Sequence, residues 1–550
     1  MRNARPDEPE WTGGAFLVRE TEPAEIFTPE DLTEEHQAVA QTTEEFFRSH
    51  LEGKPEADHA GALRRAAELG LTVLLVPERY GGMDLDIISA ALAAGRLAGD
   101  GRYALRHCDL SGPAVIPLLW YGSGAQRERF LPPISAGESV AAQCLAGTVG
   151  AAPDNAGFSL SAERLFCRNA SQTTPLLAAG VSPDGEHSVF VIDAGAAGVS
   201  AEPDGSLALE RVAVEPGAVL GEKGQGPEIV RRALALEKLL HCHAASGAAR
   251  EIAHELLDLI RAANRDSPPD SLVRQAAASV AVQSFAAESS AYRLTGMVQR
   301  CAAGGTAEPA AIEEFLAECA LARSMVGRSL EAVLSLSAQI RGQLAWRRTG
   351  AVERSWREAL EDTPFPVSRD CADAAAALTE PSRLGRLSLF SAAERVADRV
   401  FDLPVHPAAE DRMEAAAMTA AGAKRIALYS IGAALRQRGL DLANDRALMA
   451  ALGELAGHAL MAESAALRAR KLQAAGTAGP WADAAWAAAR DELDAALPRA
   501  CSLLSACFLG DDLRTGLTVL RRLAAAPPHD AISSRERIAE YLLDTGGRWG

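Results

Sequence analysis

The stretch EIVRRALALEKLLHCHAASGAAREIAHELLDLIRAA runs from Glu228 to Ala263 with apolar residues at the three- and four-residue spacing of a helix. A second stretch of this kind, FLAECALARSMVGRSLEAVLSLSAQI, runs from Phe315 to Ile340. Long helices with a continuous apolar stripe are typical of a bundle that buries this stripe. The sequence therefore predicts a helical bundle over residues 227–378.

Upstream of the bundle, the pattern changes to short β-type runs. Examples are HSVFVIDA (His187–Ala194) and SLALERVAV (Ser206–Val214), separated by Gly, Pro, Asp and Asn. We predict a reduced β-domain with few strands over residues 140–226. Helical spacing governs residues 32–139 before it and residues 379–550 after the bundle, and residues 1–31 form an N-terminal extension. The predicted fold class is mainly α with a small β-domain.

The charge balance limits the class of partner. The chain has 55 Lys and Arg against 73 Asp and Glu, a net charge of −18. A nucleic-acid partner is not expected, because phosphate binding needs a basic surface. No apolar run approaches the roughly 18 residues of a membrane span, and the first residues lack the apolar core of a secretion signal. Nine cysteines without a CxxC pair indicate reduced thiols, so we expect a cytoplasmic protein.

Common catalytic motifs are absent from the sequence. There is no GxGxxG, P-loop lysine motif, GxSxG or HExxH. His241 and His243 are two residues apart, and residues at this spacing do not share a helix face. We interpret them as buried or half-buried helix residues and predict no metal site.

Several specific segments resemble the acyl-CoA dehydrogenase family, in its long-chain and very-long-chain branch. They are VPERYGGMDLDIISAAL (Val76–Leu92), YGSGAQRERFLPPISAGE (Tyr121–Glu138) and VLGEKGQG (Val219–Gly226). The similarity runs nearly end to end. It implies an N-terminal helical domain, a middle β-barrel-like domain, a C-terminal four-helix bundle and an additional C-terminal helical domain.

The reaction of this family requires particular groups, and the sequence can be searched for them. A carboxylate removes the α-proton of an acyl thioester, a flavin takes the β-hydride, and donors stabilise the thioester oxygen. The family's F-E-G-T motif falls on Phe365-Pro366-Val367-Ser368. Proline has no proton acceptor and no backbone N–H, so Pro366 removes both functions of the glutamate that it replaces.

The positions that hold FAD in the family are also altered. The tryptophan beside the flavin ring falls on Phe166, followed by Arg168 in place of a small hydroxyl residue. The R-x-Q-F segment keeps only Arg265, followed by Asp266. The Q-I-x-G-G-x-G segment keeps Gln339 and Gly342 but has side chains at two glycine positions. The resemblance therefore implies that FAD binding has been lost and that no cofactor is expected.

One residue supports the opposite interpretation. The isovaleryl type of the family carries its base in an L-D-L-E-R helix, and LALEK places Glu237 there. This alternative is an active, divergent FAD-dependent dehydrogenase with Glu237 as the α-proton base. The competing interpretation of Glu237 is an ordinary helix glutamate.

The leading hypothesis is a non-oxidising pseudoenzyme of fatty acid metabolism. It binds acyl-CoA or an acyl-carrier thioester, or serves as a partner subunit, as a homodimer or in a heteromer with an active homologue. A second alternative is a new non-redox activity that uses Cys144, Cys167 or Asp154. Residues 382–403 mix basic and apolar side chains, and we favour a packed helix over contact with a membrane surface.

Overall fold

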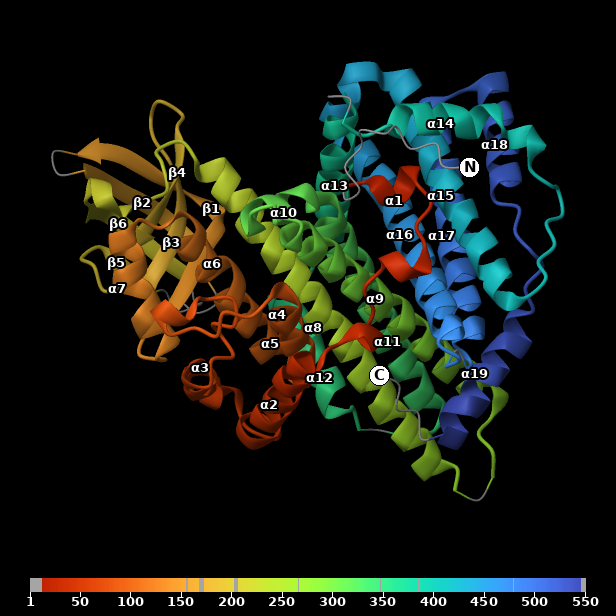
Figure 1. Cartoon of the computed structure of the whole chain (residues 1–550), viewed down its shortest axis with the longest axis horizontal. Helices are drawn as coiled ribbons and strands as arrows, with labels where there is room; N and C mark the ends of the chain where they lie inside the picture. Colours follow the sequence, from red (N-terminus) through yellow and green to blue (C-terminus); the bar gives the residue numbers. More distant parts are fainter. Residues whose placement is uncertain are drawn as a thin grey trace. The chain divides into compact units, whose positions relative to one another are not determined.

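The computed structural model is mainly helical with one β-sheet, as the sequence predicts (Figure 1). It describes residues 12–154, 157–167, 173–201, 206–265, 267–346, 348–383, 386–477 and 479–545. Arg168 and Asp266, which entered the cofactor prediction, lie outside these ranges. Among the described residues, no helix is long and apolar enough to cross a membrane.

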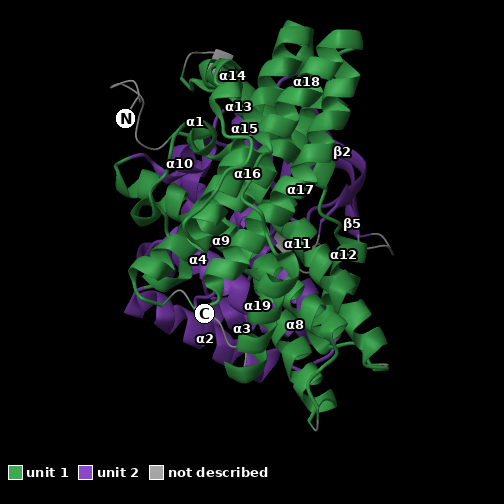
Figure 2. Ribbon diagram, turned by 90° about the vertical axis from the view of Figure 1, so that its right-hand side faces the viewer, with its two compact units in different colours: residues 1–32, 245–305, 314–550 green, residues 33–244, 306–313 purple. Residues whose placement is uncertain are grey.

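The chain forms two compact units (Figure 2). Unit 1 comprises residues 1–32, 245–305 and 314–550, and unit 2 comprises residues 33–244 and 306–313. One long helix, α8 (Gly226–Ala263), begins in unit 2 and continues into unit 1. The five segments expected from the sequence, and the four boundaries between them, stay predictions.

Unit 2 begins with short helices that are joined by tight turns. The predicted turn after Val76 contains a short 3-10 helix, η4 (Glu78–Tyr80), and ends at Gly81 with φ of +84°. A Cβ at Gly82 would lie 2.0 Å from the carbonyl oxygen of Val76, so the turn requires both glycines. The helices of this part are α2 (Glu34–His50), α3 (His59–Glu68), α4 (Ile87–Arg96), α5 (Gly101–Asp109), α6 (Ile116–Tyr121) and α7 (Gly124–Ser135).

The sheet of unit 2 has seven strands in the order β5-β6-β2-β1-β3-β4-β7. Its pairs are antiparallel except for β1 with β3, which run parallel. Val149, Leu160 and Phe190 are among the buried residues of its core. The strands are β1 (Val140–Asp154), β2 (Gly157–Phe166), β3 (Thr173–Val181), β4 (His187–Ile192), β5 (Val199–Ala201), β6 (Ser206–Val214) and β7 (Val219–Leu220). The sheet is thus larger than the few strands that the sequence suggested.

The described residues of unit 1 form helices and connecting loops, and they include no strand. The long helices α9, α11, α13 and α16 pack against one another, and α15, α16 and α17 form a second group of neighbours. The bounds are α9 (Ser271–Ala303), α11 (Leu316–Gln343), α12 (Ala351–Asp362), α13 (Val367–Arg383), α14 (Leu389–Asp398), α15 (Arg412–Arg438), α16 (Arg446–Ala474), α17 (Trp481–Cys507), α18 (Gly510–Leu523) and α19 (Ala531–Thr545).

The leader of the chain, residues 12–32, is bound to helix α16 by ion pairs. The buried Arg468 guanidinium donates to a Glu30 carboxylate oxygen at 2.7 Å and to a Glu288 oxygen at 2.8 Å. About one helical turn further along α16, Lys471 pairs with Asp31 and donates to the Ile26 carbonyl oxygen at 2.9 Å. The beginning of the chain is therefore part of the same core as its last third.

Candidate functional site

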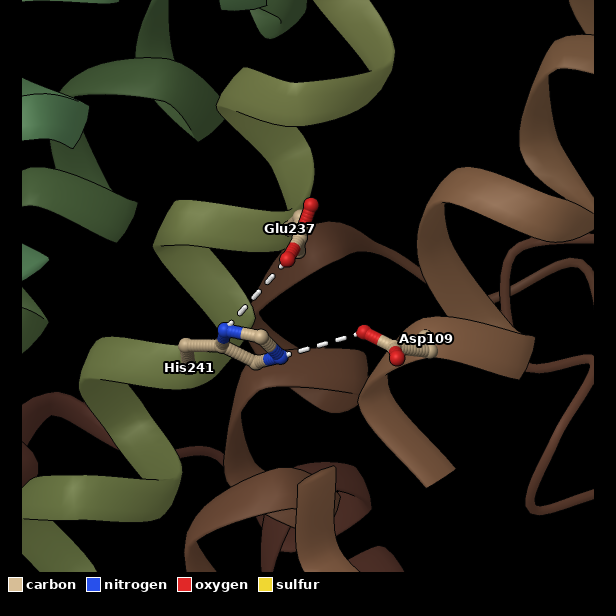
Figure 3. Close-up of side chains that lie close together, drawn as sticks. All are labelled: Asp109, Glu237 and His241. Atoms are coloured by element: carbon tan, nitrogen blue, oxygen red, sulfur yellow. Dashed lines mark ion pairs between the residues drawn. The ribbon is translucent and has the colours of Figure 1, made fainter. Parts of the chain in front are cut away.

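Three ionisable side chains meet inside unit 2 (Figure 3). Glu237 and His241 are one turn apart on α8 and therefore share a face of this helix. Asp109 is the last residue of α5. His241 Nε2 lies 3.2 Å from Asp109 Oδ1, and His241 Nδ1 lies 3.7 Å from Glu237 Oε1. We refer to Asp109, His241 and Glu237 as the triad.

The triad is shielded from solvent. The exposed fraction is 1% for His241, 5% for Asp109 and 9% for Glu237. Asp109 is followed directly by the short π-helical segment η5 (Leu110–Ala114), which packs against the Leu240 side chain of α8. A Cβ added to Gly112 in this segment would lie 2.8 Å from Leu240 Cδ1. Glycine at this position therefore lets the end of α5 pack tightly on the helix that carries His241.

The imidazole stands between the two carboxylates and faces each with a different nitrogen. A protonated histidine donates from both nitrogens, so it can bridge two acids. The structure therefore places three groups that can carry a proton side by side.

The same atoms could also contribute to a cation site. The three ligand atoms lie within 4.8 Å of one another. A single ion could contact only one of the two imidazole nitrogens, and each nitrogen already faces one carboxylate. The observed geometry therefore fits proton sharing better than coordination of one ion.

The position of the family's other base, Pro366, has a different environment in unit 1. Pro366 is exposed in the turn between α12 and α13, whereas the preceding Phe365 is buried. The nearby carboxylate of Asp370 is buried and accepts two 2.7 Å hydrogen bonds from Arg323. A hollow of about 590 Å³ at this turn is lined by Arg328, Glu331, Phe365, Pro366, Val367, Ser368 and Arg369.

The four predicted cofactor positions are exposed in this chain. The Phe166 side chain is 70% exposed, and the Arg164 guanidinium lies 4.7 Å from its ring centroid. Arg265, Gln339 and Gly342 are also exposed. A Cβ at Gly342 would meet no protein atom within 4 Å.

The backbone of Ala345 has a conformation that is typical of glycine. Ala345 occupies the position of the last glycine in the family's Q-I-x-G-G-x-G segment and adopts a left-handed φ of +52°. This conformation favours glycine, because a Cβ crowds the following carbonyl oxygen. The preceding Arg341 is held in an ion pair with the buried Glu353, which also accepts a 2.6 Å hydrogen bond from Ser337.

The residues considered for a new non-redox activity lie in and around the sheet. Cys144 and Cys167 are buried in its core. The adjoining Cys167 thiol and burial raise the pKa of Cys144, which opposes formation of a nucleophilic thiolate. Asp154 is exposed at the end of β1.

Sequence reasoning singled out Glu237 but missed its two neighbours in the triad. His241 and His243 are buried helix residues, as predicted. The four-residue spacing of Glu237 and His241 was a usable signal, because both belong to one predicted helix. Asp109 lies in a distant helix, and no local pattern connects it with α8.

Comparison with known proteins gives consistent results along the chain. Residues 33–138 match the acyl-CoA dehydrogenase N-terminal domain, and residues 224–365 and 422–522 match two models of the acyl-CoA dehydrogenase C-terminal domain. A probable acyl-CoA dehydrogenase of Bacillus subtilis (strain 168) is 25% identical over 581 residues, which is 97% of each chain. The mitochondrial isovaleryl-CoA dehydrogenase of Arabidopsis thaliana is 27% identical over 199 residues, 32% of this chain and 49% of that protein.

The fold comparison agrees with the sequence comparison. An acyl-CoA dehydrogenase complexed with FAD from Bacillus anthracis has a TM-score of 0.90 and 23% identity, covering 97% of this chain and 99% of that structure. The three family models follow one another in the expected order and together cover more than half of the 550 residues. This chain belongs to the acyl-CoA dehydrogenase family.

Proposed function

We propose that this family member binds an acyl thioester without oxidising it, as a homodimer or as the partner subunit of an active homologue. The observation that carries the proposal is the turn at Phe365–Pro366, which offers neither a proton acceptor nor a backbone donor at residue 366. The exposed positions Phe166, Arg265, Gln339 and Gly342 support it, because they form no cradle for a flavin in this chain.

Flavin content is the direct test of this proposal. We expect the purified full-length protein to show no flavin absorption, before or after incubation with excess FAD and removal of unbound cofactor. Octanoyl-CoA should nevertheless bind in a calorimetric titration. A stable flavin spectrum would contradict the proposal, and so would the absence of any acyl-CoA binding together with the absence of a partner.

Oligomeric state separates the two forms of the proposal. Light scattering of the isolated protein would report a homodimer. Co-purification with a flavin-containing homologue from the same cell would report the partner role. A chain that stays monomeric and binds no homologue would rule out both forms.

The triad supports a second candidate function, in which Glu237 exchanges the α-proton of an acyl thioester. Oxidation would in addition require FAD, which in this family accepts the β-hydride. The residues of this chain would act only on the proton: Glu237 accepts it, and His241 remains paired with Asp109 at 3.2 Å. Exchange of α-hydrogen for deuterium in octanoyl-CoA, measured in D₂O by mass spectrometry, tests this candidate without any flavin.

A further inference from the structure

A cavity of about 780 Å³ lies within unit 1, far along the sequence from the triad. Helices α14, α15, α16 and α18 contribute to its wall, together with leader residues 17–22. This volume is within the range of sites that bind small molecules. Neither proposed function uses this cavity, so the inference below stands apart from both.

Arg425 on α15 is a partly buried charged group of this wall. Its Nε atom is buried and has no hydrogen-bond partner among the described residues. Burial lowers the pKa of Arg425, yet a guanidinium remains protonated in proteins. Arg425 is only partly exposed and forms no ion pair with any described residue, so an anion supplied from outside the chain would be favoured here.

Three acids line the cavity: Glu20 and Glu22, which are exposed, and the more enclosed Glu463, which is already engaged. Glu463 forms an ion pair with Lys424 and accepts a 2.8 Å hydrogen bond from Arg293. Burial opposes ionisation of Glu463, but the Lys424 and Arg293 charges outweigh it and lower its pKa. Glu463 is therefore committed to two cations, and Arg425 keeps its positive charge for another partner.

Three further arginines strengthen the positive potential of the cavity. Arg395, Arg399 and Arg470 line it, and none of them forms an ion pair with any described residue. This grouping is notable in a chain with 18 more acidic than basic residues. Guanidinium groups bind carboxylate and phosphate oxygens with two parallel N–H donors, which point charges cannot do.

Apolar side chains form much of the rest of the wall, which also includes Arg19, Glu20, Thr21, Glu22, Lys424 and Arg522. Side chains without polar atoms come from the leader, α14, α15 and α16, and they include Leu17, Val396, Leu428 and Leu467. A small inorganic anion would leave this surface in contact with water. A ligand that combines an anionic head with an apolar tail would satisfy both parts of the wall.

We propose that this cavity binds a single-chain anionic amphiphile, with a carboxylate or phosphate head held by Arg425 and an acyl-type tail against the apolar wall. The ligand enters as a monomer and not as part of a bilayer. Arg395, Arg399 and Arg470 attract the head, and Arg425 binds it.

Calorimetric titration of the full-length protein tests this proposal, with dodecanoate and dodecyl phosphate below their micellar concentrations as probes. We expect saturable binding of at least one probe and an affinity at least about tenfold lower in Arg425→Gln. Arg436→Gln is the matched control, because Arg436 is exposed on the same helix and does not line the cavity. Equal affinities of the wild type and Arg425→Gln would overturn the proposal.

Further measurements keep the test independent of folding and identify the head group. Arg470→Glu changes an exposed residue, so it should fold and still weaken binding several-fold. A preference for dodecanoate would assign a carboxylate head, and a preference for dodecyl phosphate would assign a phosphate head. Inorganic phosphate binding as tightly as dodecyl phosphate, or binding only to phosphatidylglycerol vesicles, would contradict a monomeric amphiphile.

Discussion

By sequence resemblance, Glu237 and Pro366 fall on the two positions where members of this family carry a proton-accepting glutamate. Glu237 is buried in a long helix, beside a histidine whose other nitrogen lies 3.2 Å from Asp109. Pro366 is exposed in a turn, and the closest buried acid, Asp370, is bound by Arg323 through two hydrogen bonds. Around Glu237, three ionisable side chains lie together and are buried, which costs desolvation free energy. Beside Pro366, the buried carboxylate of Asp370 is already paired with Arg323. The comparison teaches that proton chemistry, if retained, belongs to α8.

The strongest test of this comparison removes the carboxylate from α8. Glu237→Gln should reduce α-hydrogen exchange of octanoyl-CoA in D₂O by at least about 100-fold, because the amide cannot accept the proton. Pro366→Ala should leave exchange unchanged, since neither side chain accepts a proton. Mass spectrometry of the recovered thioester measures both variants. If wild type and Glu237→Gln exchange equally, Glu237 has no chemical role.

A second test removes the group between the two carboxylates. His241→Leu should lower the free energy of unfolding of unit 2 by about 3 kcal/mol, because two buried acids lose their shared partner. His254→Leu is the control on the same helix. His254 is partly exposed, and its ring lies 3.9 Å from Glu251, so its loss should cost less than about 1 kcal/mol. Urea unfolding followed by hydrogen exchange of each unit would distinguish these outcomes.

The stability of the two units should depend on pH in opposite directions: unit 2 should be destabilised by acid and unit 1 by alkali. Burial lowers the pKa of His107, two residues before Asp109, to about 4. Its folded pKa is below the unfolded value of about 6.5, so unit 2 should lose stability as the pH falls from about 6.5 towards about 4. The expected loss between pH 7 and pH 5 is about 2 kcal/mol.

In unit 1, burial opposes the charge on His458, but hydrogen bonds with Glu454 and Glu492 outweigh it and raise its pKa to about 9. Its contribution is complete below about pH 6.5 and is lost as the pH rises through about 9. Hydrogen exchange, corrected for intrinsic rates, would measure each unit separately. His107→Leu should abolish the acid sensitivity of unit 2 alone. Identical pH profiles in both units would refute this contrast.

The smallest expected effect concerns the altered cofactor segment at the end of α11. Ala345→Gly should stabilise unit 1 by up to about 1 kcal/mol, because its φ of +52° strains a residue with a Cβ. Ala338→Gly is the control in the interior of the same helix and should cost about 1 kcal/mol. Thermal unfolding measures both changes. A loss of stability in Ala345→Gly would show that its side chain makes favourable contacts in solution.

The sequence was sufficient to predict much of this fold, because long helices have a clear apolar period. Stretches such as Glu228–Ala263 correspond closely to the observed α8. The sheet was underestimated, because β1 contains the segment AGTVGAAPD, whose Gly, Ala and Pro are poor strand formers. Its pairing with β2 and β3 overrides this local preference.

The candidate site was only partly predictable. Glu237 could be located from its helix and from the family resemblance, and its spacing to His241 follows from helix geometry. Asp109 could not be located, because its contact with α8 depends on the packing at Gly112. The structure likewise shows that Ala345 keeps a glycine-like backbone, which no residue type in the sequence indicates.

The ion pairs between the leader and α16 also bear on how the chain folds during synthesis. Glu30 and Asp31 are synthesised long before their partners Arg468 and Lys471, which belong to α16. All residues of unit 2 are synthesised before α16, so unit 2 can fold before the leader has its α16 partners. A nascent chain arrested before α16 should expose this leader to proteases, and full-length release should protect it.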